Sequence, residues 1–179
     1  MKWAIAIWLV VMVATVGASG YFDGCYASSD AEKVEAARAP EFDLIRLNGL
    51  PVRLREHQGK TIILDFWATW CAPCEVQMPI LNELWNRRGG PDLLVLGVSM
   101  DTRPADEVVA WLKERELGYP IAISDQQLAL DYGAWAFPTL VVVDPHGNIY
   151  KTHQGVLSRP QLDDLLDQIA REFPSLPRG

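Results

Sequence analysis

The sequence predicts an α/β fold with a mixed central sheet flanked by helices. Two continuous apolar runs, "KTIILDFWA" (60–68) and "DLLVLGVSM" (92–100), are typical of strands that are covered on both faces. Each run is followed by a helical pattern, which favours parallel strands joined by crossovers. The chain then finishes with a hairpin pattern and one more helix, so we expect an antiparallel part in the same sheet.

Before the first buried strand, the segment "FDLIRLNGLPVRL" (42–54) predicts an added β-hairpin. Its two alternating pieces, Phe42–Leu47 and Val52–Leu54, lie on either side of Asn48-Gly49. This dipeptide suits the positive-φ positions of a tight turn.

The helices are predicted from their start and stop signals. We expect one from Ala72 to about Arg88, and another over 104–118, with Pro104 near its first turn and Gly118 past its end. "QQLALDYG" (126–133) predicts a short helix. Near the chain's end, "TLVVVD" and "NIYKTHQG" form a hairpin pattern, and Ser158 is the expected N-cap of a closing helix.

Composition limits the possible functions. The chain has 179 residues, of which 49% are hydrophobic, so one domain with a real core is expected. A formal net charge of −7 argues against a nucleic-acid partner, which would require a basic face. Three cysteines are too few for a multi-disulfide scaffold or a four-thiolate zinc site.

The N-terminal segment predicts export. Trp3–Phe22 carries no charge and is long enough to cross a bilayer as a helix. Lys2 before it and acids after it favour an inside N-terminus and an exported C-terminus. We therefore expect 1–22 to be a signal anchor or a cleaved signal peptide, with lipidation at Cys25 as a further possibility. Residues 23–40 read as a polar tether, and 41–179 as the exported domain.

The motif "WCAPC" carries the chemistry. Cys71 directly follows a predicted strand and loop, so it should lie at the N-terminus of the next helix, where free N–H groups and the helix dipole stabilise a thiolate. Such cysteines have lowered pKa values and are nucleophiles near neutral pH. Cys74, one turn later, can attack a mixed disulfide on Cys71 and release the substrate.

Two other interpretations of the pair remain open. It could be half of a zinc or copper site, but none of His57, His146 and His153 has metal-ligand spacing to it. It could also be a static structural disulfide, although so short a loop should stabilise little. We expect no metal and no bound cofactor beyond a redox-active Cys71–Cys74 disulfide.

Taken together, "APEFDLIRLNGLPVRL", "GKTIILDFWATWCAPC" with "MP" after it, "FPTLVVVD" and "GNIYKTHQG" resemble the thioredoxin superfamily, in particular its exported TlpA/ResA-like branch. The resemblance covers about Ala39 to Phe173. It implies a thioredoxin fold with an added N-terminal hairpin, and thiol–disulfide oxidoreductase activity outside the cytoplasm.

The resemblance also implies a substrate surface. Pro138 matches the family's cis-proline, whose loop faces the cysteines and lets the preceding residue, Phe137, pair with substrate backbone. Trp70 flanks the active site as in the family and is expected to contact substrate. Trp135, shortly before the proline, is a further candidate for this surface.

Asp65 stands out because it is a carboxylate inside an apolar strand. Burial should raise its pKa, so that it could take the proton of Cys74 during the second step. The family keeps either an aspartate or an asparagine at this place. A core residue that only makes hydrogen bonds is the alternative. Gln77 departs from the family, since many members have a glutamate there, which leaves acid–base assistance to Asp65.

The sequence therefore predicts a membrane-tethered or exported protein-disulfide reductase. Its expected partners are an exported disulfide-containing client, such as an apocytochrome c, and a membrane electron donor that keeps the dithiol reduced. A peroxiredoxin-like peroxidase is an alternative, but it would need Thr or Ser where this chain has Ala68. A copper metallochaperone using the same cysteines is another.

Overall fold

The computed structural model describes residues 37–174, and in this part of the chain five strands form one mixed sheet in the order β5-β4-β3-β6-β7. β4 runs parallel to both β3 and β5, whereas β6 is antiparallel to both β3 and β7, which confirms the predicted mixed sheet. The strands are β3 (Thr61–Trp67), β4 (Leu93–Ser99), β5 (Ile121–Ile123), β6 (Thr139–Val143) and β7 (Ile149–Gln154).

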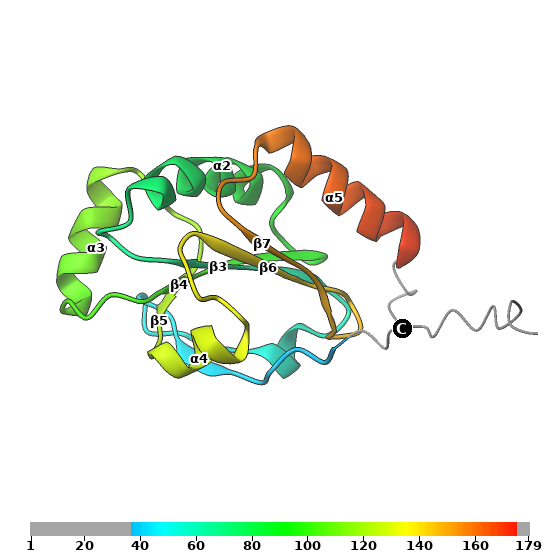
Figure 1. Ribbon diagram of the computed structural model, residues 1–179, viewed down its shortest axis with the longest axis horizontal. Coiled ribbons are helices and arrows are strands. Elements are labelled where there is room, and N and C mark those ends of the chain that lie inside the picture. The colour runs from blue at the N-terminus through cyan, green and yellow to red at the C-terminus, as the bar shows by residue number, and fades with distance from the viewer. Residues whose placement is uncertain (1–36, 175–179) are drawn as a thin grey trace, which may run out of the picture. The chain divides into compact units, whose positions relative to one another are not determined.

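Helices cover both faces of this sheet. Figure 1 shows α2 and α5 on one side, and α4 with the N-terminal hairpin on the other. One apolar core joins α2, α3 and α5 to the first face, and a second core joins the hairpin and α4 to the opposite face. The helices are α2 (Ala72–Arg88), α3 (Ala105–Glu114), α4 (Gln126–Asp131) and α5 (Arg159–Glu172), with a short 3-10 helix η1 (Leu54–His57).

The added hairpin consists of β1 (Asp43–Ile45) and β2 (Pro51–Arg53), paired antiparallel. Gly49 has a φ of +82° in the turn, a conformation that side chains with a Cβ rarely adopt. The Asn48 side chain accepts a hydrogen bond from the Leu50 N–H at 3.2 Å. Gly49 thus takes the positive φ that was predicted, whereas Asn48 does not and contributes through its side chain.

β3 is the central strand, and all seven of its residues are buried. Because side chains alternate across a strand, Ile62, Leu64 and Phe66 enter the core on the hairpin side. Ile63 and Trp67 enter the core on the side of α2. Asp65 lies between these two in the alternation, so its carboxylate is on the same side as α2.

Two details differ from the sequence prediction. α3 ends at Glu114, before Gly118, because Glu116 adopts a φ of +55° and the Leu117 N–H returns to the Leu112 carbonyl at 3.1 Å. The strand β5 was not predicted, since three residues after a proline give too short a pattern. The end of α3 and the pairing of β5 with β4 together position the segment 117–121, whose Tyr119 and Ile121 side chains pack in the core.

Contacts begin at the start of the described chain. The Ile149 N–H donates to the Ala37 carbonyl at 2.7 Å, and the Ala39 N–H donates to the Gly147 carbonyl at 3.0 Å. Ala37 and Ala39 were predicted to belong to the tether, whereas in the structure their backbones pair with the β6–β7 turn and the start of β7. The expected signal segment, most of the tether and Cys25 lie outside the described residues. Within residues 37–174, no helix is both long enough and apolar enough to span a bilayer.

Candidate active site

Cys71 and Cys74 form a disulfide at the start of α2, with an S–S distance of 2.07 Å. Cys71 is the N-cap of the helix, and its sulfur accepts a hydrogen bond from the Cys74 N–H at 3.3 Å. Pro73 lies in the first turn, where no intrahelical N–H is lost. The Cys74 N–H and the positive end of the helix dipole are suited to stabilising a thiolate on Cys71 once the disulfide is reduced.

The two sulfurs differ in access to solvent. Cys71 keeps 5% of its surface exposed, whereas Cys74 is completely buried. Of the two sulfur-bearing residues, only Cys71 is therefore open to another molecule in this state. This geometry matches an attacking cysteine and a resolving cysteine.

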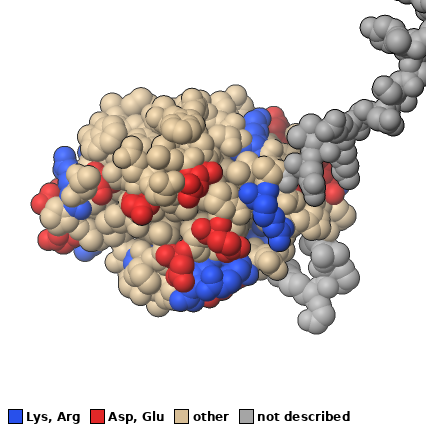
Figure 2. Space-filling view, turned by 60° about the horizontal axis from the view of Figure 1, so that its bottom comes forward, with Lys and Arg blue, Asp and Glu red and all other residues tan. Residues whose placement is uncertain are grey.

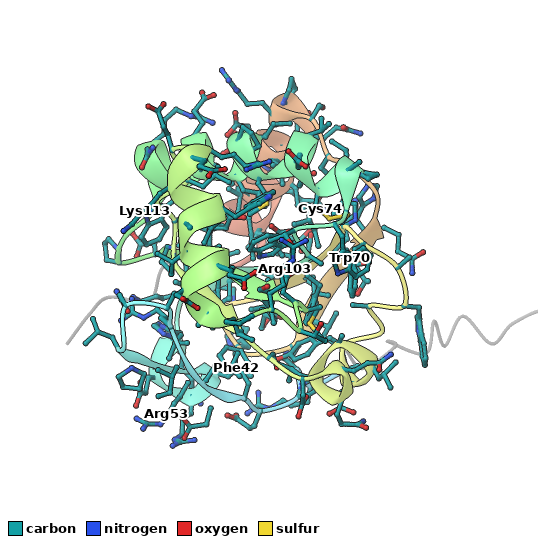
Figure 3. The ribbon with its side chains drawn as sticks, turned by 90° about the vertical axis from the view of Figure 1, so that its left-hand side faces the viewer. Phe42, Arg53, Trp70, Cys74, Arg103 and Lys113 are labelled. Carbon is teal, nitrogen blue, oxygen red and sulfur yellow. A yellow bond between two sulfur atoms is a disulfide. The ribbon has the colours of Figure 1, made fainter. Side chains whose placement is uncertain are left out.

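The loop before β6 contacts Trp70, the residue that directly precedes Cys71. The Phe137–Pro138 peptide bond is cis, as the family resemblance implies, and the Gly155 N–H donates to the Pro138 carbonyl at 2.8 Å. The Phe137 ring is 5.9 Å from the ring of Trp70, which is 65% exposed next to Cys71. In Figure 3, Trp70 and Cys74 lie close together, away from Phe42 and Arg53 of the hairpin region.

The ring contact brings Trp70 and Phe137 together next to Cys71, whereas Pro138 is itself buried. Trp135, the further candidate, is 73% exposed two residues before Phe137. Tryptophan rings that are exposed in this way combine a large apolar area with a polar N–H, which suits contact with another chain. The assignment of all four residues to substrate contact stays a prediction.

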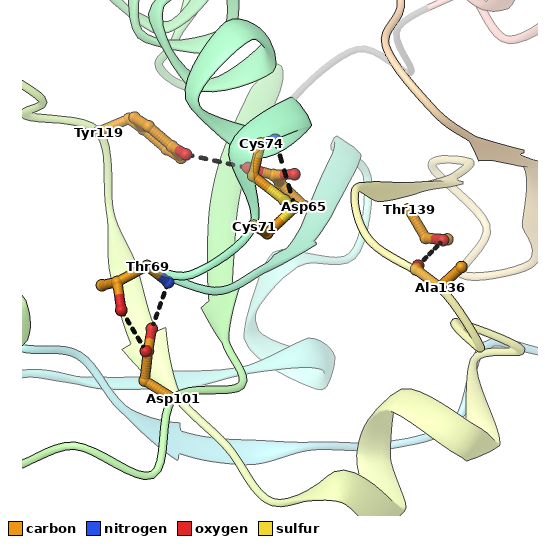
Figure 4. Close-up of a disulfide and its surroundings, with 8 residues drawn as sticks. All are labelled: Asp65, Thr69, Cys71, Cys74, Asp101, Tyr119, Ala136 and Thr139. Carbon is orange, nitrogen blue, oxygen red and sulfur yellow. Dashed lines mark hydrogen bonds between the residues drawn. A yellow bond between two sulfur atoms is a disulfide. The ribbon is translucent and has the colours of Figure 1, made fainter.

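Asp65 is completely buried on the α2 side of the sheet, and Figure 4 shows it drawn with the disulfide. Its Oδ2 accepts a hydrogen bond from the Tyr119 hydroxyl at 2.9 Å. Its Oδ1 is buried without a hydrogen-bond partner among the described residues. Burial raises the pKa of Asp65 from 3.8 to about 7, although the hydrogen bond from Tyr119 opposes this change. A carboxyl with a pKa near neutrality can both accept and return a proton.

Gln77 is also completely buried, one turn after Cys74. Its Oε1 accepts a hydrogen bond from the Leu157 N–H at 2.6 Å, which ties α2 to the segment before α5. The Nε2 group has no hydrogen-bond partner within 37–174. Gln77 therefore has a structural contact here and supplies no ionisable group.

Sequence reasoning missed a hydrogen-bonded cluster that holds the loop before Cys71. Asp101 accepts from the Thr69 N–H at 2.9 Å and from the Thr69 hydroxyl at 2.6 Å. The Ser99 hydroxyl donates to the same carboxylate at 2.9 Å. Figure 4 shows the two bonds to Thr69. A signal was available, because Thr69 and Asp101 each follow the carboxyl end of one of two neighbouring parallel strands, where functional side chains gather.

Stacked tryptophan and arginine side chains connect β3, α3 and the first turn of α2. Trp67 is buried and stacks on Trp111, with ring centroids 5.3 Å apart. The Arg115 guanidinium lies 3.8 Å from the Trp111 ring centroid and also pairs with Glu75 at 3.1 Å. Glu75 directly follows Cys74, so this ion pair links the first turn of α2 to the end of α3.

Charge on the surface is mixed. In the view of Figure 2, acidic and basic side chains are interspersed, and a broad part of that face carries neither. Among the described residues, His, Cys, Asp and Glu side chains do not form a group of three or more that could hold a metal ion.

Comparison with known proteins places the chain among redox proteins. The model of the AhpC/TSA family matches residues 36–152. The chain is 30% identical over 168 residues to the thioredoxin-like protein YneN of Bacillus subtilis, covering 93% of this chain and 97% of YneN. It is 32% identical to the thiol-disulfide oxidoreductase ResA of Geobacillus thermodenitrificans, covering 89% of this chain and 92% of ResA.

Solved structures support the same fold. The exposed lipoprotein thioredoxin of Streptococcus pneumoniae superposes with a TM-score of 0.63 at 28% sequence identity, covering 72% of this chain and 99% of that protein. The predicted thioredoxin fold with an added N-terminal hairpin is therefore confirmed.

Proposed function

The chain belongs to the AhpC/TSA family and is a thiol–disulfide oxidoreductase of the ResA type, and we propose that it reduces the disulfides of exported client proteins outside the cytoplasm. The observation that carries this proposal is the asymmetric cysteine pair at the start of α2. Cys71 is slightly exposed at a helix N-terminus, while Cys74 is fully buried behind it. A pair of this kind suits stepwise exchange better than a static crosslink.

In the proposed reaction, the Cys71 thiolate attacks one sulfur of the client disulfide, and the other client sulfur leaves as a thiolate. The Cys74 thiol then gives its proton to Asp65 and attacks the Cys71 sulfur. The second client sulfur leaves as a thiolate and takes a proton from water. Two electrons pass from the dithiol to the client, and the Cys71–Cys74 disulfide forms.

We further propose that the domain works on the outer side of the cell membrane. The apolar segment Trp3–Phe22 would export it, whether that segment is retained as an anchor or cleaved as a signal. The similar pneumococcal protein is described as an exposed lipoprotein, which agrees with such a location. An exported dithiol is oxidised unless it is re-reduced, so a membrane electron donor is the partner that this proposal requires.

The client that we propose first is an apocytochrome c. Its C-x-x-C-H haem-attachment motif holds two nearby cysteines, which must be reduced before haem is attached. The exposed ring of Trp70, which directly precedes Cys71, would provide an apolar contact for such an unfolded segment, and the exposed ring of Trp135, two residues before Phe137, would add a second one.

The test is reduction of insulin's interchain disulfides by the pre-reduced full-length chain, with a Cys71→Ser variant as control. We expect insulin reduction by the wild-type chain and none by the variant. The potential of the Cys71–Cys74 couple should lie near about −270 mV, as for a reductant, and away from about −120 mV, as for an oxidant. Tight Cu(I) binding without insulin reduction would instead favour a metallochaperone, and rapid hydrogen peroxide turnover would favour a peroxidase.

A further inference from the structure

We propose that Tyr119 is a positioning residue for the release step: its hydroxyl holds one oxygen of Asp65 and leaves the other oxygen free to take the proton of Cys74. This inference rests on the proposed function, in which Asp65 is the proton acceptor. It assigns a role in the exchange reaction to a tyrosine that lies outside the cysteine motif and outside the cis-proline loop.

The contact itself is direct and shielded from water. The Tyr119 hydroxyl donates to Asp65 Oδ2 at 2.9 Å across a sequence separation of 54 residues. Tyr119 is 3% exposed and Asp65 is fully buried, so water does not compete for this bond. Figure 4 shows the Tyr119 side chain extending from the segment before β5 toward Asp65. Because Oδ2 is occupied and Oδ1 has no partner in the described chain, the two oxygens are not equivalent.

A glycine makes room for the tyrosine ring. Gly97 of β4 is the register partner of Asp65 on β3. A Cβ at position 97 would lie 3.1 Å from Cε2 of Tyr119 and 2.4 Å from Cδ1 of Ile121. Real Cβ atoms essentially never approach other heavy atoms at the second of these distances, so any side chain here would force its neighbours to move. The bare backbone of Gly97 is thus part of the arrangement that lets Tyr119 reach Asp65.

Few other ionisable groups face Asp65. The start of α2 contributes the disulfide-bonded sulfurs of Cys71 and Cys74 to the core on this side of the sheet, and the segment before β5 contributes Tyr119, which acts on the Asp65 carboxyl. On β4 the register partner is the glycine described above, and on β6 it is Leu140, so neither neighbouring strand places a charge there. Tyr119 is therefore the main polar influence on the carboxyl besides the cysteines themselves.

The tyrosine is suited to act as a permanent donor. Burial, together with the nearby Asp65 carboxylate, raises the pKa of Tyr119 well above its usual value, so the phenol keeps its proton at neutral pH. The proton of Cys74 must then go to the free Oδ1 of Asp65. The Cys74 thiolate attacks the Cys71 sulfur and the client sulfur leaves, while Tyr119 holds the same hydrogen bond throughout.

The experiment compares Tyr119→Phe with Tyr132→Phe in the full-length chain. Tyr132 is a matched control because it is another buried tyrosine, 2% exposed, whose hydroxyl donates to the Pro40 carbonyl on the opposite face of the sheet. The first readout is the carboxyl-carbon NMR titration of Asp65, with its signal assigned by its loss in Asp65→Asn. The second is the rate of client release in single-turnover reduction of insulin, measured as a function of pH.

We expect the Asp65 titration midpoint to rise by about one pH unit in Tyr119→Phe, since a hydrogen bond to the ionised form is lost. At pH 7 the ionised fraction, and with it the release rate, should fall about fivefold and recover at higher pH. Tyr132→Phe should lower the melting temperature without moving the midpoint. Gly97→Ala places a Cβ against the Tyr119 ring as well as against Ile121 and Trp67, and it should move the midpoint in the same direction. It is the second variant to measure if Tyr119→Phe does not fold.

An unchanged Asp65 midpoint and an unchanged pH profile in a folded Tyr119→Phe chain would overturn the inference, because Tyr119 would then be a packing residue only. Failure of the proposed function gives a different result, namely a wild-type chain that does not reduce insulin at all. The two failures are therefore distinguishable in one set of measurements.

Discussion

Two buried aspartates on neighbouring strands, Asp65 within β3 and Asp101 just after β4, have opposite surroundings. Asp101 accepts three hydrogen bonds from Thr69 and Ser99, so both of its oxygens are paired. Asp65 accepts one, from Tyr119, and its other oxygen has no partner in the part of the chain described. Both residues are shielded from solvent: Asp101 is 6% exposed and Asp65 is 0% exposed.

The difference shows how one residue type can serve two roles in one site. A carboxylate with satisfied oxygens fixes the backbone that it binds, and here that backbone leads to Trp70 and Cys71. An under-satisfied buried carboxyl is costly when ionised, so its pKa rises and it becomes able to exchange protons. Asp101 is expected to hold the loop, and Asp65 to assist the chemistry.

The largest expected effect is the loss of stability in Asp101→Ala. This change leaves the Thr69 N–H and hydroxyl and the Ser99 hydroxyl without their acceptor in a buried place. Hydrogen bonds to a charged group contribute about 1.5–3 kcal/mol each, and partial relaxation should limit the total to roughly 4 kcal/mol. Urea denaturation measures it. A loss below about 1 kcal/mol would contradict the role assigned to Asp101.

The second prediction is that Asp65→Asn stabilises the oxidised protein at pH 8 but not at pH 4. The folded-state pKa of about 7 lies above the usual 3.8, so the folded chain holds a proton that the unfolded chain releases. The contribution of Asp65 to the free energy of unfolding is therefore at its maximum below pH 4. It decreases as the pH rises to about 7 and does not change further above that pH. The pKa difference corresponds to roughly 4 kcal/mol.

Because the new amide nitrogen lacks an acceptor, we expect a net gain of about 2 kcal/mol at pH 8. Client release should slow about tenfold in the same variant, because the proton acceptor is lost. Denaturation at pH 4 and pH 8, with single-turnover insulin reduction, measures both. A variant that is less stable at pH 8 and releases insulin at the wild-type rate would identify Asp65 as a structural residue.

The smallest expected effect is that of Thr69→Val. It removes the hydroxyl bond to Asp101 but keeps the backbone bond, so we expect a loss of about 1.5 kcal/mol in unfolding free energy, the low end of the range for one such bond. Insulin turnover should fall by less than in Asp65→Asn, because only the loop is loosened. A stability loss as large as that of Asp101→Ala would mean that the hydroxyl, and not the backbone bond, carries the interaction.

Local pattern was enough to predict the parts of the site that are local in the sequence. The strand β3, the helix from Ala72 to Arg88, and the positions of Cys71 and Cys74 at its start all follow from residues within about one turn or strand of each other. The cis-proline required the family resemblance, because a cis bond is a minority outcome for any single X–Pro pair.

The supporting contacts could not be predicted this way. The bond from Tyr119 to Asp65 spans 54 residues, and that from Thr69 to Asp101 spans 32, so neither leaves a periodic signal. Tyr119 also depends on where α3 ends, and that end is set by the positive φ of Glu116 and not by the glycine that the sequence suggests. The partners of Asp65 and Asp101 are therefore set by long-range packing, which local sequence patterns do not reveal.

Trapping the mixed disulfide with insulin is the most direct test of the roles of the two cysteines. The reduced Cys74→Ser chain should accumulate a covalent complex with an insulin chain on non-reducing mass spectrometry, because the Cys71 thiolate attacks and nothing resolves. The reduced Cys71→Ser chain should form none, since Cys74 is fully buried. Equal trapping by the two variants, or trapping by Cys71→Ser alone, would contradict the assignment of Cys71 as the attacking thiolate and Cys74 as the resolving one.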